Sequence, residues 1–279
     1  PLPVRNINTT APMLALAGLG GTGESEMRAR AQWLIQGLPR TPDGGFQHTT
    51  TDDAVKGTIH RNEGEVWVDT LFMAALFLAR YGRIHNDPAC MNEAVHQFLL
   101  HIKYLYDKNT GLFYHGYTFL EKHNFGGIRW GRGNSWFTIA VMELPDILGD
   151  TLDGGTKAFL LDTYRAQARA LKDLQSPDGL WHTVLDDPAS YPEASGSAGF
   201  LYGLLKGIHS GILDGSYIAC TEKAVRALLA CVAPDGTVER VSAGTAMGWN
   251  ADHYRHIITA PMAYGQALTL LAFSEALQR

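Results

Sequence analysis

The chain contains 279 residues, of which 46% are hydrophobic and 18% charged, and its formal net charge is −5. This is the composition of a globular protein with a sizeable core, and no apolar run is long enough to cross a bilayer. Acidic and basic residues are interspersed, which argues against general nucleic-acid binding. The three cysteines have no C-x-x-C spacing, so we expect neither a disulfide framework nor a zinc site, and a reducing, cytoplasmic compartment is favoured.

Two classes of helix are predicted to alternate along the chain. Apolar, small-residue-rich runs lie at 12–19, 69–81, 134–148, 195–208 and 261–277. Amphipathic runs lie between them, at 24–38, 87–106, 157–174 and 217–232. Helices that are apolar around most of their circumference pack inside others that have a polar face, so the pattern predicts an all-α toroid of helical hairpins. Only short β-like pieces are expected, at 113–117 and 237–241.

One turn pattern, a glycine followed by an aromatic residue and a histidine, occurs three times and ends at His48, His115 and His182, which are 67 residues apart in both intervals. A fourth copy at 235–239 is degenerate. In a toroid of hairpins these turns and the N-termini of the inner helices gather at one end, which predicts a ligand site there. The alternative for each histidine is a purely structural role in its turn.

The stretch Trp130–Trp136 combines two indoles, a guanidinium and two glycines just before an apolar run. Asn134 or Ser135 is predicted to cap the helix, and Arg132 to hold a carboxylate through two hydrogen bonds. A flat ring can stack on either tryptophan. The alternative is a capped core helix with two buried tryptophans. Phosphate binding is disfavoured, because no G-x-x-x-x-G-K-[ST] motif is present.

Asp69 is the candidate catalytic carboxylate, because it lies in an almost wholly apolar stretch at the start of an inner helix. The alternative is a simple helix cap. Burial near Trp67 and Phe72 favours the neutral acid and the helix N-terminus favours the anion, so the sequence leaves the protonation state open. No H-x-x-x-H or H-E-x-x-H spacing is present, and we expect no metal site. Without a G-x-S-x-G motif, nucleophilic acyl transfer has no support.

Five ordered motifs resemble the unsaturated rhamnogalacturonyl hydrolases, glycoside hydrolase family 105: Val68–Met73, Trp130–Trp136, Leu180–Pro188, Glu193–Ala198 and Pro261–Ala267. The resemblance implies an (α/α)6 barrel, no metal or other cofactor, and an oligosaccharide substrate from pectin. The reaction it implies is removal of a 4,5-unsaturated uronic acid from the non-reducing end of lyase-generated rhamnogalacturonan oligosaccharides. It makes Asp69 the acid/base, and it makes substrate contacts of His60, His115, Trp130, Arg132 and Trp136.

The sequence departs from this family near its start. Many relatives place a second active-site carboxylate before an early inner helix, where this chain has Asn6 and Asn8. If Asn6 takes that position, as a substrate contact, an amide replaces an acid. The implied chemistry needs only one carboxyl group, since hydration of the C4=C5 double bond lets Asp69 act as acid and then as base. A catalytically silent sugar-binding toroid is the alternative.

The helix count predicts an incomplete ring. The nine expected helices fall short of the twelve in a closed six-hairpin barrel, so residues 1–279 are expected to form one α/α-barrel domain that lacks about three N-terminal helices. We expect a gap between the first and last inner helices, covered by a partner chain or by residues 6–10. Exposed apolar surface of this kind also suggests a homo-oligomer.

Overall fold

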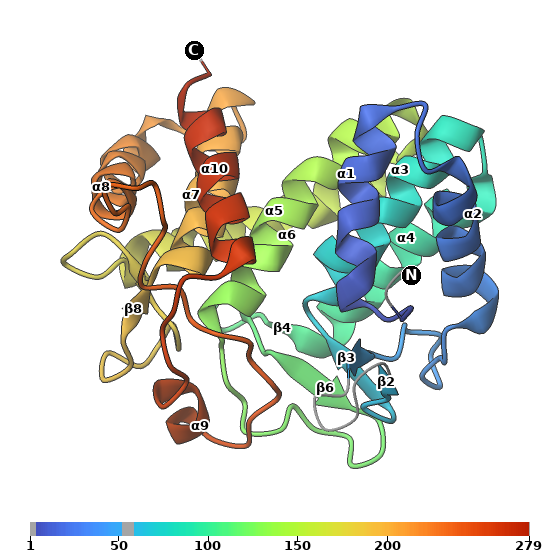
Figure 1. Cartoon of the computed structure of the whole chain (residues 1–279), viewed down its shortest axis with the longest axis horizontal. Coiled ribbons are helices and arrows are strands. Elements are labelled where there is room, and N and C mark those ends of the chain that lie inside the picture. Colours follow the sequence, from blue (N-terminus) through green and yellow to red (C-terminus); the bar gives the residue numbers. More distant parts are fainter. Residues whose placement is uncertain (1–3, 52–58, 279) are drawn as a thin grey trace. The chain divides into compact units, whose positions relative to one another are not determined.

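The structure, a computed structural model, describes residues 4–51 and 59–278, and its elements are mainly helical (Figure 1). The all-α class is confirmed. The predicted amphipathic helices are α2 (Glu24–Gln32, continued by the π-helical turn η2, Trp33–Gly37), α4 (Pro88–Leu105), α6 (Gly154–Leu174) and α8 (Ile218–Leu229). The predicted apolar helices are α1 (Ala11–Leu19), the π-helical turn η3 (Leu71–Ala75) with α3 (Leu76–His85), α5 (Gly131–Leu148), α7 (Ala194–His209) and α10 (Ala263–Ala276).

The remaining elements are short. Sequence analysis did not predict α9 (Ala251–Arg255), and 3-10 turns occur at η1 (Asn8–Thr10), η4 (Gly149–Thr151) and η5 (Gly215–Tyr217). The strands form antiparallel pairs: β1 (Thr50–Thr51) with β2 (Ile59–His60), β3 (Glu65–Trp67) with β6 (Gly116–Thr118), β4 (Tyr106–Asp107) with β5 (Leu112–Phe113), and β7 (Trp181–His182) with β8 (Pro192–Glu193). In the described part of the chain, no helix is long and apolar enough to cross a membrane.

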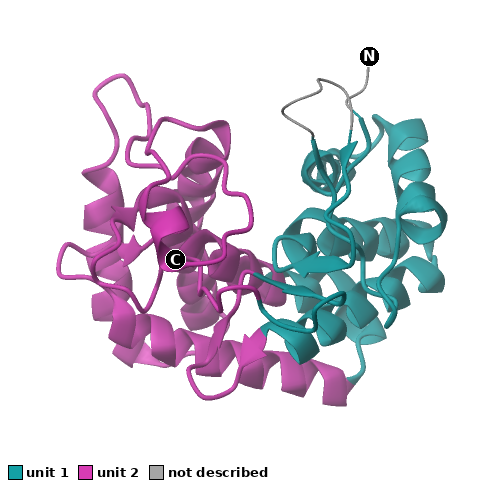
Figure 2. Ribbon diagram, turned by 90° about the horizontal axis from the view of Figure 1, so that it is seen from below, with its two compact units in different colours: residues 1–105, 116–124, 143–153 teal, residues 106–115, 125–142, 154–279 magenta. Residues whose placement is uncertain are grey.

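The chain divides into two compact units, coloured separately in Figure 2. Unit 1 comprises 1–105, 116–124 and 143–153, and unit 2 comprises 106–115, 125–142 and 154–279. Within unit 1, α3 packs against α1 and α4. Within unit 2, α7 packs against α8 and α10. The single barrel domain expected from the sequence stays a prediction.

Glycines on α7 allow close packing within unit 2. A Cβ atom on Gly199 would lie 2.7 Å from the Ser135 Cβ, and one on Gly203 would lie 2.8 Å from the Thr138 carbonyl oxygen, both on α5. Side chains at these glycines would push the two helices apart. The small-residue pattern therefore marks a helix that approaches its neighbour closely, as the sequence predicts.

The repeated turn has a glycine with positive φ in all four copies. The φ angle is 84° for Gly44, 78° for Gly111, 99° for Gly179 and 86° for Gly236. Only glycine adopts this region without strain. A Cβ on Gly179 would also lie 2.7 Å from the Lys223 carbonyl oxygen on α8, whereas one on Gly236 would meet nothing within 4 Å. The repeat is therefore a structural turn, packed on a following helix in some copies only.

Each unit contains an apolar helix that is only partly covered. On α1 only Ala17 is buried, and Leu19 is 78% exposed. On α10, Leu270 and Leu277 are 59% and 83% exposed. Residues 6–10 bond within unit 1. The expected gap and the homo-oligomer stay predictions.

Candidate active site

Asp69 lies in the short link between β3 and η3 in unit 1. It is 6% exposed, and its neighbours Val68, Thr70 and Leu71 are fully buried. Thr70 directly precedes the first residue of η3 and makes no side-chain cap hydrogen bond. The helix-cap role of Asp69 stays an alternative, and its buried neighbours place its carboxyl group in an apolar stretch.

The helix that follows Asp69 begins with a π-helical turn. The Leu76 N–H donates to the Leu71 carbonyl oxygen, five residues back instead of four. Such turns are rare, and they are frequent at functional sites because they rearrange the backbone next to a reactive group. This local geometry agrees with a functional role for Asp69.

His48, in the first repeated turn, has a structural role. Its ring stacks on Trp67, with centroids 4.1 Å apart and an angle of 10° between the planes, and Nδ1 lies 3.2 Å from Thr70 Oγ1. Burial, with a smaller contribution from nearby His101, lowers the pKa of His48 to about 3. A histidine that stays neutral and packed in this way contributes stability, as the structural alternative for the turn predicts.

Asn6 is fully buried at the start of the described chain. Its Nδ2 donates to Thr51 Oγ1 at 2.9 Å, and its Oδ1 accepts the Thr9 N–H at 2.8 Å. The amide therefore holds the turn that precedes α1. Asn8, the alternative position for the missing acid, is exposed, and His60 is exposed on β2.

The start of α5 differs from the prediction. The helix begins at Gly131, so Asn134 and Ser135 lie inside it, and the prediction that one of them caps the helix is wrong. Asn134 instead accepts the Phe113 N–H and donates to the Phe113 carbonyl oxygen, both at 2.8 Å. Its amide thus pairs with β5 much as a neighbouring strand would.

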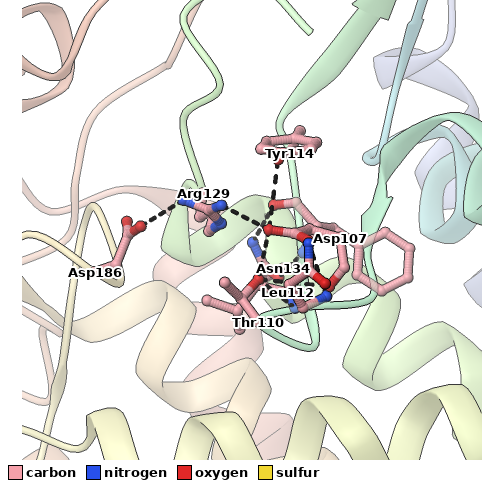
Figure 3. Close-up of polar contacts among 9 residues, drawn as sticks. Asp107, Thr110, Leu112, Tyr114, Arg129, Asn134 and Asp186 are labelled. Atoms are coloured by element: carbon pink, nitrogen blue, oxygen red, sulfur yellow. Dashed lines mark hydrogen bonds and ion pairs between the residues drawn. The ribbon is translucent and has the colours of Figure 1, made fainter.

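An ion-pair network fixes the chain just before Trp130. Arg129 contacts Asp107 Oδ2 at 2.7 Å and Asp186 Oδ2 at 2.6 Å, while the Tyr114 hydroxyl lies 3.4 Å from Asp107 Oδ2 (Figure 3). These contacts join the β4–β5 turn to the loop after β7. They position the entry into α5 within unit 2.

Arg132 is 4% exposed, and protein acceptors occupy both of its terminal nitrogens. One donates to Ser195 Oγ at 3.2 Å and to the Ser242 carbonyl oxygen at 2.8 Å. The other donates to the Ala243 carbonyl oxygen and to Thr245 Oγ1, both at 3.0 Å. A two-bond contact with a substrate carboxylate needs two guanidinium N–H groups, and the two terminal nitrogens already donate these four hydrogen bonds to the protein. In this conformation the guanidinium binds the segment 242–245 instead, and its role as a substrate contact stays a prediction.

The aromatic rings around Arg132 are packed rather than open. Its Cζ lies 4.6 Å from the ring centroids of both Trp130 and Tyr264, and the His115 ring centroid is 4.3 Å from that of Trp130. Trp130 is 2% exposed and Trp136 is 4% exposed. The buried-tryptophan alternative therefore describes both residues, and sugar stacking on Trp130 has no open ring face in this conformation.

His115 is 2% exposed and bonds to a residue that the sequence did not single out. Its Nδ1 lies 2.7 Å from the hydroxyl of Tyr254, a fully buried residue of α9. The Asn250 side chain caps α9, so an N-cap pattern in the sequence signals this helix. No local signal identifies its partner 139 residues away.

Glu193 is a second buried carboxylate, at the start of α7. It accepts the N–H groups of Ser195 at 2.8 Å and Gly196 at 2.5 Å, and the Ser242 N–H at 3.3 Å. The Ser195 hydroxyl donates to Glu193 at 2.7 Å while it accepts from Arg132. Glu193 is therefore a helix cap connected to Arg132 through Ser195.

The predicted site residues divide between the two units. Asn6, His60 and Asp69 belong to unit 1, where Asn6 bonds to Thr51 on β1 and His60 lies on the paired strand β2. In unit 2, His115, Trp130 and Arg132 form one packed group. Trp136 lies farther along α5 in the same unit. Among the described residues, no group of three or more His, Cys, Asp or Glu side chains is arranged to hold a metal.

Comparison with known proteins gives consistent results. A family model described as Glycosyl Hydrolase Family 88 matches residues 22–279. The unsaturated rhamnogalacturonyl hydrolase YesR of Bacillus subtilis is 34% identical over 250 residues, which cover 89% of this chain and 69% of YesR. An unsaturated 3S-rhamnoglycuronyl hydrolase of Alteromonas sp. is 31% identical, over 76% of this chain and 51% of that protein.

Solved structures share the fold. A possible member of family GH105 from Salmonella enterica serovar Paratyphi A is 40% identical, with a TM-score of 0.92 over 98% of this chain and 72% of that one. A possible member from Klebsiella pneumoniae is 39% identical, with a TM-score of 0.91 over 98% and 71%. The α/α-toroid fold class is therefore shared with these proteins.

Proposed function

Because the chain belongs to glycosyl hydrolase family 88, we propose that it removes a 4,5-unsaturated uronic acid from the non-reducing end of rhamnogalacturonan oligosaccharides made by a lyase. The uronic acid in this proposal is the unsaturated galacturonyl residue found in pectin fragments. The similarity to YesR supports that choice. The observation that carries the proposal is Asp69, a carboxylic acid buried in an apolar link directly before a π-helical turn.

Asp69 supplies both proton transfers in the proposed mechanism. As a neutral acid it donates its proton to C4, and the C4=C5 π electrons form the new C–H bond. The cation left at C5 is stabilised by the ring oxygen. Water then attacks C5 and gives its proton to the Asp69 carboxylate, which restores the acid. The hemiketal opens to a ketone at C5, and the hemiacetal left at C1 breaks down to an aldehyde as the neighbouring sugar leaves with a proton.

A single carboxyl group is enough for this reaction. Ordinary glycosidases use two carboxyl groups at a set separation, because one protonates the leaving group while the other attacks or activates water. Here the double bond is the site of protonation. The buried amide of Asn6 bonds to Thr51 and Thr9 and has no ionisable proton. The proposed mechanism does not require a proton from it. Asn6 is proposed to hold the turn beside the substrate.

The other predicted residues are proposed to bind the substrate. The Trp130 Nε1 is buried and has no hydrogen-bond partner among the described residues, which leaves an indole N–H to donate to a sugar oxygen. His115, Trp136 and exposed His60 are proposed as further contacts. Arg132 is proposed to meet the uronate carboxylate only if segment 242–245 releases its terminal nitrogens.

A reducing compartment remains part of the proposal. The three cysteines are free and buried, and burial raises the pKa of the Cys90 thiol to about 12 and of the Cys220 thiol to about 11. Thiols of this kind are poor nucleophiles and do not form disulfides readily. The cysteines therefore fit the cytoplasmic localisation expected from the sequence.

The test follows the ultraviolet absorbance of the C4=C5 bond with an unsaturated rhamnogalacturonyl disaccharide, and with an unsaturated glucuronyl disaccharide in parallel. Loss of absorbance together with release of free rhamnose supports the proposal. Faster loss with the glucuronyl substrate corrects the choice of uronic acid. Binding by calorimetry without absorbance loss on either substrate contradicts the proposal and supports the silent sugar-binding alternative.

A further inference from the structure

The segment 242–254 of unit 2 is anchored at both ends by residues of the proposed site. At its start, Arg132 donates to the Ser242 and Ala243 carbonyl oxygens. At its end, Tyr254 contacts His115. The Trp130 ring contacts both His115 and Arg132. Its centroid lies 4.3 Å from the His115 ring centroid and 4.6 Å from the Arg132 Cζ. The segment therefore bonds to two of the proposed substrate contacts, Arg132 and His115.

Tyr254 is held firmly enough to act as an anchor. It is fully buried and packs with Trp130 and Val184 in one hydrophobic cluster. The Gly248 N–H donates to its hydroxyl oxygen at 3.1 Å. The chain is tight here, since a Cβ on Gly248 would lie 2.3 Å from the His253 ring. The position of the phenol is thus fixed by packing and by a backbone donor, independently of His115.

The hydrogen bonds around the phenol determine where its proton goes. In the described contacts its oxygen accepts the Gly248 N–H, and its hydrogen can be donated to the His115 Nδ1 at 2.7 Å or to the Met247 sulfur at 3.8 Å. An imidazole nitrogen is a much better acceptor than a thioether. When the imidazole is neutral, the hydroxyl therefore donates to Nδ1 and the ring proton lies on Nε2.

We propose that Tyr254 is a positioning residue that holds His115 as the Nε2–H tautomer, so that His115 donates a hydrogen bond to an oxygen of the unsaturated uronyl group. This inference rests on the proposed function for the identity of the substrate. The tautomer itself does not depend on it. The role of His115 is then to bind the sugar as a donor, while the proton transfers remain with Asp69.

The first experiment measures the tautomer without substrate. Long-range proton–nitrogen NMR on protein labelled with 15N-histidine distinguishes the two tautomers, and the His115 signals are identified by their absence in His115→Gln. We expect the Nε2–H form in the wild type and a mixture of forms in Tyr254→Phe, which keeps the buried ring but lacks the donor. An Nδ1–H tautomer in the wild type overturns the proposal, even if Tyr254→Phe does not fold.

The second experiment compares two buried tyrosines of the same unit. Tyr164 is fully buried and donates to the Gly203 carbonyl oxygen at 2.7 Å. Tyr164→Phe therefore removes an equivalent hydrogen bond away from His115. With the unsaturated disaccharide we expect Tyr254→Phe to raise KM about 10-fold with a much smaller change in kcat, because the binding donor is misplaced. Tyr164→Phe should lower Tm without changing KM.

The outcomes separate the two proposals. If the wild type turns over the disaccharide and Tyr254→Phe has unchanged KM and an unchanged His115 tautomer, the positioning role is wrong while the proposed function stands. If the wild type does not act on the disaccharide, the proposed function fails, and the NMR measurement alone decides whether Tyr254 sets the tautomer.

Discussion

His48 and His115 occupy the same position of one repeated turn and are almost equally buried, at 1% and 2% exposure, but their surroundings differ. His48 bonds to Thr70, 22 residues away, and lies flat on Trp67. His115 bonds to Tyr254, 139 residues away, and its ring is tilted by 44° against Trp130. One histidine completes the packing of its own turn, and the other is oriented by a distant segment that also binds Arg132.

The difference shows that a repeat fixes backbone conformation and leaves the chemistry of each copy to its partners. All four turns keep a glycine with positive φ, because the chain reversal demands it. What each histidine does depends on which side chains the rest of the fold delivers to it. Variants of the two histidines, and of the residues around them, therefore test which contacts serve function and which serve stability.

The largest expected effect is at Asp69, which the proposed mechanism makes the source of both proton transfers. Asp69→Asn keeps the shape of the side chain and removes its acid. We expect kcat to fall by about three orders of magnitude or more, because both proton transfers are lost, while substrate binding persists. Steady-state kinetics and calorimetry on the disaccharide measure the two effects. A kcat within tenfold of the wild type would move the chemistry elsewhere, with His115 the next candidate.

Arg132→Lys tests the other anchor of segment 242–254. Lysine keeps the charge but has one nitrogen, so it cannot satisfy four acceptors in two directions. If the uronate also uses this group, we expect kcat/KM to fall by an amount equivalent to about 1.5–3 kcal/mol. We expect a lower Tm in either case, because two buried and two partly buried hydrogen bonds are disturbed. A lower Tm with unchanged kcat/KM would show that Arg132 only holds the segment.

A matched pair of substitutions compares the two histidines directly. His115→Gln should lower kcat/KM about 10-fold with a modest change in Tm, since it removes a placed donor. His48→Gln should lower Tm and leave kcat/KM unchanged, since it removes a ring stacked in the interior. The reverse pattern would mean that the functional copy of the turn is the first one.

The acid sensitivity of folding gives a further contrast. The pKa of His48 is about 3 in the folded protein, against 6.5 for an ordinary histidine, because burial penalises the charged ring. Between these values the unfolded chain binds a proton that the folded chain does not, so stability falls as pH decreases from 6.5 towards 3. The slope from this one group approaches about 1.4 kcal/mol per pH unit. His48→Gln should reduce that slope in urea unfolding at pH 4–6, and an unchanged slope would contradict the neutral buried ring.

The smallest expected effect concerns the turn itself. Gly179→Ala and Gly236→Ala both place a side chain at positive φ, which costs about 1 kcal/mol. Only the first also places a Cβ 2.7 Å from the Lys223 carbonyl oxygen. Gly179→Ala should therefore lower Tm more than Gly236→Ala, and neither should alter KM. Equal losses of Tm would indicate that the chain relaxes around Gly179.

Much of the fold can be read from the sequence because its helices are long and their periodicity is clear. The alternation of amphipathic and apolar runs predicted α1 to α8 and α10 within a few residues of their observed ends. Short elements carry too little periodicity, so α9, with five residues, was missed. The start of α5 was misplaced because Asn134, which looks like a local cap, binds Phe113 on a strand 21 residues earlier.

Site residues could be predicted where a local sequence pattern identifies them. They could not be predicted where contacts between distant residues determine their role. Asp69 stands out as an acid in an apolar run, and its burial agrees with that reading. Arg132 looked like a free guanidinium, but its partners at 242–245 lie more than 100 residues away and carry no motif. Tyr254 was missed for the same reason. Local sequence indicates which groups are reactive, whereas tertiary contacts decide which of them are already engaged.

The central claim is that Asp69 delivers a proton to C4 of the unsaturated uronyl group. Proton NMR of the reaction in D2O tests it most directly, because the vinyl H4 signal, the released sugar and the C4 position of the product are all visible in one spectrum. At early times we expect H4 to disappear as the sugar is released, with deuterium on a single face of C4. Deuterium on both faces, or sugar released while the double bond persists, would contradict hydration by a positioned acid.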